Sequence, residues 1–371
     1  MRIAQVAPLY ESVPPKLYGG TERVVSYLTE ELVRQGHEVT LFASGDSVTA
    51  ARKVSPCNRS LRFNRSCADH LVHHLLLLER VFQDANEFDI IHFHCDYLHF
   101  PLSRRHPQPN ITTLHGRLDL PDLIPLYREF IEVPVVSISD SQRRPLPWLN
   151  WQRTIYHGLP LNLYRLFPKG GEYLAFAGRI SPEKGLDRAI EIAKRVGIKL
   201  RIAAKVDRAD VQYFREAIQP LLDHPLVEFL GEIGEGEKNE FFGNAAALLV
   251  PVDWPEPFGL VMIEALACGT PVIGWNRGSV PEVIDDGESG FVVQTLEEAV
   301  GAIEGIHQLS RDKCRDIFER RFSVSRMTSD YLYAYGELIE TMAEPGVAHN
   351  GCGRRNPHKG TVLHPFDFLS G

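Results

Sequence analysis

The fold class is decided by the stretch EYLAFAGRISPEKGLDRAIEIAKRVGIKLRIA, residues 172–203. Residues 172–177 form an apolar run that predicts a buried strand, and residues 178–185 form a polar loop flanked by glycines. Residues 186–196 repeat apolar side chains at helical spacing, and residues 199–203 predict another strand. This order indicates two parallel strands joined by a helix, which is the unit of a Rossmann-like α/β domain.

The same unit occurs at the N-terminus. Residues 2–7 predict a strand, residues 22–35 predict a helix with Thr21 as its N-cap, and residues 37–43 predict a second strand. We expect further buried strands at 89–93, 110–114, 133–137, 227–230, 246–250, 271–274 and 290–293, and helices at 236–244, 258–267 and 296–307.

These elements predict two Rossmann-like domains with parallel sheets. The first covers residues 1–165 and the second residues 170–325, with a linker rich in proline and glycine around residues 160–171. We expect a long helix at 326–342 and a mobile tail at 345–371, which lacks any periodicity. Because ligands bind at the carboxyl ends of parallel strands, the predicted site lies in the cleft between the domains.

Composition places the chain among ordinary soluble globular proteins. It has 371 residues, of which 44% are hydrophobic and 24% charged, and these values exclude disordered and fibrous classes. The apolar runs are too short for a membrane span, and we expect neither a signal peptide nor an anchor. The 6 cysteines contain no C-x-x-C pair, which favours reduced thiols and a cytoplasmic protein.

One segment, residues 51–66, carries cations and no acid. Its charges can meet an anionic acceptor or the inner face of an anionic membrane, and the alternative interpretation is a solvated loop. It lacks the aromatic ladder or known motif of a nucleic-acid-binding protein, so we expect no nucleic-acid partner. The cations are Arg52, Lys53, Arg59, Arg62 and Arg65.

Residues 254–269, WPEPFGLVMIEALACG, place two carboxylates around a helix start. Pro257 keeps Glu256 in the entering loop, whereas Glu264 lies about a turn and a half into the helix. Backbone N–H groups near Phe258, Gly259 and Leu260 can bind phosphate, and carboxylates can bind sugar hydroxyls. This segment therefore predicts binding of a sugar together with its nucleotide.

The loop at 178–185 carries two cations between a strand and a helix. Arg179 and Lys184 can hold a diphosphate and stabilise it as a leaving group, and Gly178 begins the loop. The alternative is that both cations are exposed and that Glu183 pairs locally with one of them.

Three further positions are candidates at the predicted cleft. Gly19 and Gly20 allow a backbone to approach a ligand closely, or they form only a turn. His115 ends a buried strand and could contact the reacting sugar, although a lone histidine can equally be structural. Glu282 follows the strand at 271–274 and either meets a donor hydroxyl or belongs to a turn.

Other chemistries have little support. The sets His92, His94, Asp96 and Cys67, His70, His74 have spacings that could hold a metal, but neither matches a known zinc motif, and we expect no metal site. The chain lacks G-x-G-x-x-G, the P-loop, G-x-S-x-G and H-E-x-x-H, which argues against dinucleotide enzymes, P-loop nucleotidases, hydrolases of that type and zinc proteases.

Together these residues resemble the retaining glycosyltransferases of family 4, which have the GT-B architecture. The likeness runs from Met1 to about Met342. Glu256 to Glu264 is similar to the E-x7-E motif of that family, and Gly19 and Gly20 are similar to its N-terminal diphosphate loop. Arg179 and Lys184 resemble its paired phosphate-binding cations, and His115 its active-site histidine.

The resemblance implies a role for each of these residues. His115, Arg179, Lys184 and Glu256 are expected to be catalytic, with the two cations stabilising the departing nucleoside diphosphate. Donor-binding residues are expected at Gly19, Gly20, Gly178, Arg179, Lys184, Glu256, Phe258, Gly259, Leu260, Glu264, which should bind the ribose, and Glu282. The resemblance also implies retention at the anomeric carbon, no obligatory metal or other cofactor, and a final helix that crosses back onto the first domain. In one departure, His157 stands where many members have asparagine.

We therefore expect a cytoplasmic enzyme that transfers a hexose from a nucleotide sugar, with UDP-glucose as the first donor to test and GDP-mannose as the second. The acceptor is expected to be a hydroxyl of a small molecule, a lipid carrier or a glycan. The alternatives are a non-catalytic sensor of sugar nucleotides and, from the Rossmann-like halves alone, an NAD-dependent oxidoreductase.

Overall fold

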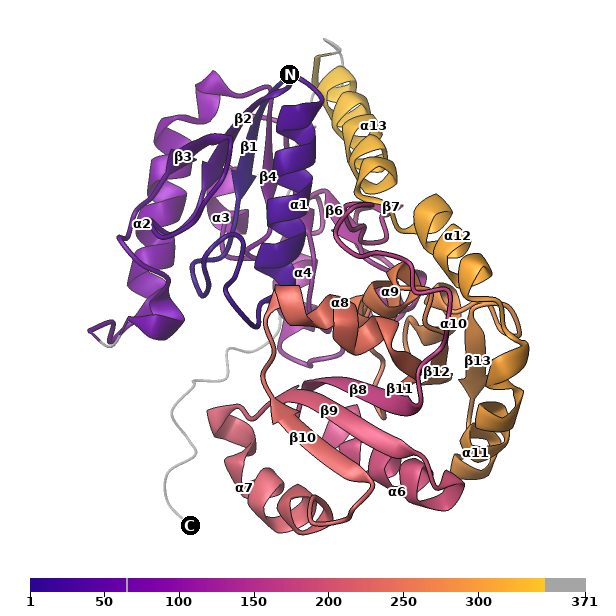
Figure 1. Ribbon diagram of the computed structural model, residues 1–371. Coiled ribbons are helices and arrows are strands. Elements are labelled where there is room, and N and C mark those ends of the chain that lie inside the picture. Colours follow the sequence, from indigo (N-terminus) through magenta and orange to yellow (C-terminus); the bar gives the residue numbers. More distant parts are fainter. Residues whose placement is uncertain (65, 344–371) are drawn as a thin grey trace, which may run out of the picture.

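The computed structural model describes residues 1–64 and 66–343 and contains two parallel sheets (Figure 1). The tail expected at 345–371 lies outside the described residues. The first sheet has 7 strands in the order β3-β2-β1-β4-β5-β6-β7, and all of its paired strands run parallel. Its strands are β1 (Arg2–Val6), β2 (Glu38–Phe42), β3 (Arg52–Val54), β4 (Ile90–Phe93), β5 (Asn110–Thr113), β6 (Val135–Ser137) and β7 (Trp151–Thr154).

The second sheet has 6 strands in the order β10-β9-β8-β11-β12-β13, again with parallel pairing. The α/β fold class with two Rossmann-like sheets is thereby confirmed. The strands are β8 (Tyr173–Arg179), β9 (Lys199–Lys205), β10 (Val227–Gly231), β11 (Ala245–Val250), β12 (Val272–Trp275) and β13 (Gly290–Val293).

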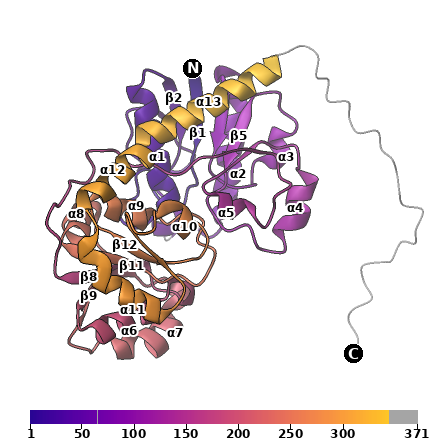
Figure 2. The ribbon, with the colours of Figure 1, turned by 90° about the vertical axis from the view of Figure 1, so that its right-hand side faces the viewer.

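Helices cover both sheets (Figures 1 and 2). Those of the first half are α1 (Gly20–Arg34), α2 (His70–Gln83), α3 (Phe100–Ser103), α4 (Leu123–Glu129) and α5 (Asp140–Arg143). Those of the second half are α6 (Leu186–Val196), α7 (Val211–Tyr213), α8 (Glu235–Gly243), α9 (Leu260–Ala267), α10 (Val280–Val283), α11 (Leu296–Gly305), α12 (Arg311–Arg321) and α13 (Val324–Ala343). No helix within residues 1–64 and 66–343 is both long and apolar enough to cross a bilayer.

The prediction of Thr21 as the N-cap of the first helix is wrong. Helix α1 already begins at Gly20, and Gly19 occupies the N-cap position with a φ of 150°. This backbone conformation favours glycine, so the Gly-Gly pair sets the helix start two positions earlier than a hydroxyl cap would. The N-terminus of α1 is therefore formed by backbone without a capping side chain.

Helix α13 completes the core of the first domain, although it comes last in the chain. Its side chains Met327, Tyr331 and Tyr335 are fully buried and belong to the same apolar cluster as Ile3 and Leu28. In Figures 1 and 2 the yellow α13 lies beside the indigo α1. The second sheet has its own apolar clusters, one on each face, and one of them extends to Ile138 of the first domain.

The chain passes between the two domains twice, and the two crossings lie side by side. Leu159 N–H donates to Phe322 O at 2.8 Å, and Val324 N–H donates to Leu159 O at 2.8 Å. A Cβ on the neighbouring Gly158 would lie 2.3 Å from Ser323 O, which is too close for any side chain. Glycine at 158 therefore permits the close pairing of the crossings.

We expect Gly158→Ala to lower the melting temperature by about 4–10 °C, because the added methyl must push the crossings apart. Gly336→Ala is the matched control: a Cβ there meets nothing within 4 Å, and alanine favours the helix, so a rise of about 1–3 °C is expected. Thermal unfolding followed by circular dichroism measures both. A Gly158→Ala variant as stable as the wild type would show that the crossings tolerate separation.

Candidate active site

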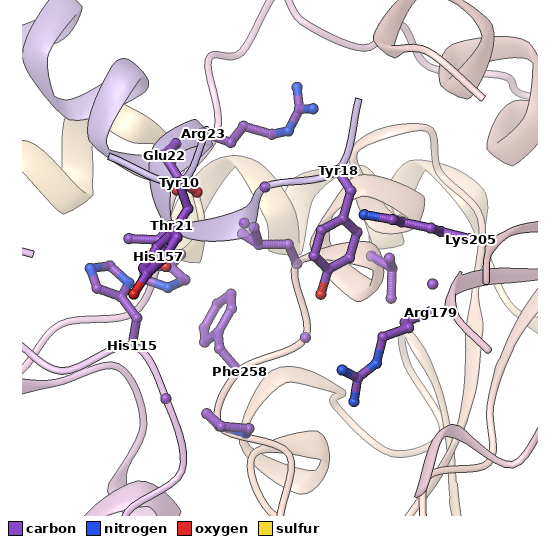
Figure 3. Close-up of a pocket in the computed structure, with 18 of the residues that line it drawn as sticks. Tyr10, Tyr18, Thr21, Glu22, Arg23, His115, His157, Arg179, Lys205 and Phe258 are labelled. Carbon is purple, nitrogen blue, oxygen red and sulfur yellow. The ribbon is translucent and has the colours of Figure 1, made fainter. Parts of the chain in front are cut away.

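A cavity of about 700 Å³ lies between the two domains. It is bordered by loops that follow the carboxyl ends of strands in both sheets: after β1, β4 and β5 in the first domain, and after β8, β9, β10 and β11 in the second. In Figure 3, His115 and His157 lie on one side, Arg179 and Lys205 on the other, and Phe258 between them. Of the predicted residues, the cavity is lined by Gly19, Gly20, His115, Gly178, Arg179, Lys184, Glu256, Phe258, Gly259, Leu260 and Glu264.

The start of helix α9 forms part of the cavity wall. The helix begins at Leu260 rather than at Phe258, because Gly259 has a left-handed conformation with a φ of 79°. A Cβ at Gly259 would lie 2.8 Å from Met262 Cε, and the positive φ alone would strain any other residue at this position. The first backbone amides of α9 can therefore approach a ligand without an intervening side chain, as a phosphate site requires.

Glu264 is buried in this wall, with 1% exposure. Lys238 Nζ, from helix α8, lies 2.7 Å from Glu264 Oε1, while Glu264 Oε2 has no hydrogen-bond partner. Sequence analysis did not identify Lys238, because it lies 26 positions away on a different helix. The free oxygen leaves this buried carboxylate able to accept a hydrogen bond from a ligand hydroxyl.

Glu256 and Lys184 form an ion pair at the cavity. Lys184 Nζ lies 2.5 Å from Glu256 Oε2, and Trp254 Nε1–H donates to the same oxygen at 2.9 Å. The Lys184 ammonium also lies 5.1 Å from the centroid of the Trp254 ring. The three side chains fix one another's positions, and all of them line the cavity, where a charged ligand can contact them.

Arg179 and Lys205 add positive charge to the second domain's side. Arg179 pairs with Glu183 at 2.5 Å, the local pairing considered in the sequence, and its Nε lies 3.5 Å from Asp210. Lys205 was not predicted; it ends strand β9, lines the cavity and lies 5.1 Å from the centroid of the Tyr18 ring. Both cations come from the carboxyl ends of adjacent strands, a position that the topology imposes.

The N-terminus of α1 meets the N-terminus of α9 across the cavity. A Cβ on Gly20 would lie 3.6 Å from Leu260 Cδ1, and Gly19 leaves the backbone bare, since a Cβ there would meet Pro15 Cβ at 2.7 Å. Nearby, Tyr18 N–H donates to Glu232 Oε1 at 3.0 Å. The structure therefore brings two glycine-bordered helix starts, one from each domain, to the same cavity.

His115 is held by a buried network that fixes its tautomer. Gln5 Nε2 donates to Tyr335 OH at 3.1 Å, so Gln5 Oε1 is free to accept from His94 Nε2–H at 2.9 Å. His94 is then an acceptor at Nδ1, where His115 Nε2–H donates at 2.9 Å. His115 Nδ1 is therefore unprotonated, and it has no partner in the protein.

Burial keeps the histidines of this network neutral. It lowers the pKa of His115 to about 3 and the pKa of His94 well below its usual value. The ring of His157, which replaces the asparagine common in the family pattern, stacks on His115 with a centroid separation of 5.3 Å and an angle of 19°. Phe258 meets His157 edge-on at 4.8 Å. His115 Nδ1 is therefore a neutral hydrogen-bond acceptor at the cavity, with the rings of His157 and Phe258 nearby.

Glu282 is the exception among the predicted residues, since it does not line the cavity. Its carboxylate accepts from the backbone N–H groups of Asp140 at 2.8 Å and Ser141 at 2.7 Å, and Tyr156 OH donates to it at 3.2 Å. The prediction of a donor contact is corrected accordingly: helix α10 directs this carboxylate at the N-terminus of α5 in the first domain, where it links the two domains.

Histidines considered as metal ligands bond protein groups instead. His92 bonds Tyr335 OH and Thr113 Oγ1, both at 2.7 Å, and His74 accepts from Leu9 N–H at 3.1 Å. Within the described part of the chain, no three His, Cys, Asp or Glu side chains are placed to hold an ion.

Most of the basic segment is also engaged. Arg52 pairs with Glu87 at 3.1 Å, Arg62 pairs with Glu11 at 3.0 Å, and Lys53 Nζ donates to Ser47 O at 2.6 Å. Arg65 lies outside the described residues. Contact of this segment with an anionic surface stays a prediction.

Two family models together cover most of the chain. The model described as Glycosyltransferase Family 4 matches residues 18–167, and the model described as Glycosyl transferases group 1 matches residues 165–323. The chain is a family-4 glycosyltransferase with the GT-B architecture. The match covers both walls of the cavity, so the carboxylates, cations and glycines described above belong to the enzyme's matched domains.

Similar proteins span nearly the whole glycosyltransferase. A phosphatidyl-myo-inositol mannosyltransferase from Mycobacterium leprae is 24% identical over 392 residues, which cover 93% of this chain and 98% of the relative. Sucrose-phosphate synthase from Thermosynechococcus elongatus has a TM-score of 0.76 at 18% identity, covering 92% of this chain and 99% of its own. Anabaena HepE, in complex with UDP and glucose, has a TM-score of 0.68 at 18% identity, covering 91% and 100%.

Removal of the Glu282 link tests its structural role. We expect Glu282→Ala to increase the radius of gyration of the ligand-free enzyme in small-angle X-ray scattering, because two charge-assisted hydrogen bonds between the domains, worth about 1.5–3 kcal/mol each, are lost. The dissociation constant for the nucleoside diphosphate should change by less than about three-fold, since the carboxylate lies outside the cavity. A large loss of nucleotide affinity without any change in shape would instead support the original donor-binding interpretation.

Proposed function

We propose that this glycosyltransferase is a retaining hexosyltransferase that needs no metal ion. UDP-glucose is the first proposed donor and GDP-mannose the second, and the acceptor is a hydroxyl group. The observation that carries the proposal is the convergence of Glu256, Glu264, Arg179 and Lys184 on one cavity that also receives the N-terminus of α9. A nucleotide sugar requires carboxylates that bind its hydroxyl groups and cations that bind its phosphates.

The donor's nucleotide half fits the second domain. Glu264 Oε2, which has no partner, would accept from a ribose hydroxyl, and Lys238 would keep the opposite oxygen of that carboxylate neutralised. The diphosphate would then lie against the first amides of α9, with Arg179, Lys184 and Lys205 supplying charge. Three cations with these amides offset the charge of a diphosphate, which supports transfer without a metal.

The sugar half would lie between the walls, beside His115 and Glu256. His115 Nδ1 can accept from a sugar hydroxyl because its other nitrogen donates to His94. In the proposed step the bond from the anomeric carbon to the phosphate oxygen breaks, and the acceptor oxygen attacks on the same face. The acceptor proton passes to the leaving phosphate, and the anomeric configuration is retained. Positive charge from Lys184 and Arg179 stabilises the phosphate as its negative charge grows.

The choice of donors rests on similar proteins. The Anabaena protein HepE has been crystallised with UDP-glucose, which supports UDP-glucose here, and the mycobacterial relative is by name a mannosyltransferase, which supports GDP-mannose. A panel of donors separates the two proposals.

We expect one sugar from a panel of UDP-, GDP- and ADP-hexoses to release its nucleoside diphosphate, and excess EDTA to leave the rate unchanged. With an accepted alcohol, proton NMR should show a product with the donor's anomeric configuration. An inverted product would contradict the proposed front-face step, and loss of all activity in EDTA would contradict metal independence. Tight donor binding without any turnover would favour the sugar-nucleotide sensor.

Substitution of the two charged groups should separate binding from chemistry. Glu264→Gln should raise the dissociation constant for the donor about ten-fold or more, because a neutral amide is a weaker acceptor for ribose. Lys184→Ala should lower kcat about 10²-fold or more with a smaller effect on donor binding, because its charge matters most when the phosphate leaves.

The exposed Glu304→Gln is a matched control and should change neither value. Calorimetric titration and initial rates provide the two readouts. An unchanged kcat in the Lys184 variant would remove its leaving-group role.

A further inference from the structure

The first domain presents its own wall to the cavity, and its chemistry differs from that of the donor wall. Tyr10 follows strand β1, and Asp96 and Tyr97 follow strand β4, so all three come from carboxyl ends of strands and line the cavity. Tyr10 is 41% exposed and Tyr97 37% exposed, so both rings are accessible from the cavity that they line. We call Tyr10, Asp96 and Tyr97 the acceptor wall.

Asp96 is the one charged member of the acceptor wall, and it is available to a ligand. No hydrogen bond or ion pair of its carboxylate is found among the described residues, although the residue lines the cavity. Its backbone has a φ of 50°, the left-handed region that non-glycine residues rarely occupy. Burial raises the pKa of Asp96 to about 6, so most of the group is ionised at neutral pH.

Two arginines of the first domain that line the cavity have carboxylate partners. Arg62 pairs with Glu11 at 3.0 Å, and Arg23 pairs with Glu235 of the second domain. A further carboxyl group, Glu22, lies in the same cavity surface and is 5% exposed, and burial raises its pKa. Because these arginines already have carboxylate partners, the Asp96 carboxylate sets the charge that a ligand meets at the acceptor wall.

The histidines beside the acceptor wall add no charge. His74 accepts from Leu9 N–H at Nε2 and contacts His70 O through Nδ1, so it is a neutral tautomer, and burial lowers its pKa. Burial likewise lowers the pKa of His157 well below its usual value. His157 lines the same cavity, is 4% exposed and has an Nδ1 atom with no partner in the protein. This buried, unpaired atom, beside His115 and Phe258, indicates that a hydrogen-bonding ligand enters the cavity next to the acceptor wall.

We propose that Tyr10, Asp96 and Tyr97 bind the acceptor, and that the part of the acceptor held here is an uncharged polyol such as a sugar ring or the end of a glycan. The tyrosine rings can cover the apolar face of a sugar, and the Asp96 carboxylate accepts from its hydroxyls. A phosphorylated headgroup would be repelled. The inference rests on the proposed glycosyl transfer, because it assigns the substrate opposite the donor.

The test uses the full chain saturated with whichever of UDP or GDP binds more tightly. The probes are the methyl α-glycosides of glucose, galactose and mannose and, as charged counterparts, their 6-phosphates, with binding measured by saturation-transfer difference NMR. At least one glycoside should bind about ten-fold more tightly than its phosphate. Asp96→Asn should weaken glycoside binding about ten-fold and reduce the difference in affinity between each glycoside and its 6-phosphate.

Asp122→Asn is the matched control, since Asp122 is an exposed carboxylate of the same domain outside the cavity, and it should behave as wild type. Tyr97→Ala provides a second variant and should also weaken glycoside binding. Equal or tighter binding of the phosphates, no binding of any glycoside, or an Asp96→Asn variant identical to the control would overturn the proposal. If the wild type bound neither UDP nor GDP, that result would instead count against the proposed function itself, so the two failures are distinguishable.

Discussion

Parallel pairing is the constraint on which the rest of the molecule depends. In a parallel sheet the loops that follow the strands all lie at one edge, and here the two sheets direct these edges at the same cavity. Gly178 and Arg179 at the end of β8, Lys205 at the end of β9, and His115 after β5 meet for this reason. The helix starts of α1 and α9 follow from the same topology, because each helix begins in a loop that leaves such an edge.

Charge in the cavity is arranged in pairs. Lys184 is held by Glu256, Lys238 by Glu264, and Arg179 by Glu183, so the positive groups do not repel one another when no ligand is bound. The pairing also reaches across the domains. Glu235 lies 3.7 Å from Lys238 Nζ and pairs with Arg23 of α1, so the buried Glu264 is connected to the first domain through two side chains. One set of charges therefore joins the two domains and the cavity.

Local sequence patterns were sufficient for the parts of this site that occur within single loops. The glutamates at 256 and 264, the cations at 179 and 184, and the paired glycines each lie beside an apolar run whose periodicity predicts the flanking element. The short edge strands β3 and β7 were not predicted, because three or four half-buried residues give too little pattern.

Contacts between distant segments left no pattern in the sequence from which they could be predicted. Gln5 and Tyr335 are 330 positions apart, yet their hydrogen bond helps set the tautomer of His115. Lys238 lies on a short helix and Lys205 ends a strand, and only the folded chain brings them to the cavity. The direction of a side chain could not be predicted from the sequence either. Glu282 follows the expected strand, but its carboxylate points toward α5.

Hydrogen–deuterium exchange with and without nucleoside diphosphate tests most directly whether the two helix starts and the cation loop form one site. The account predicts slower exchange in residues 18–23, 178–185 and 256–264 and no change around the separate surface cavity of about 460 Å³ that Asp187, Trp275 and Gln294 line. Protection confined to that second cavity, or equal exchange in all three segments with saturating nucleotide bound, would contradict it.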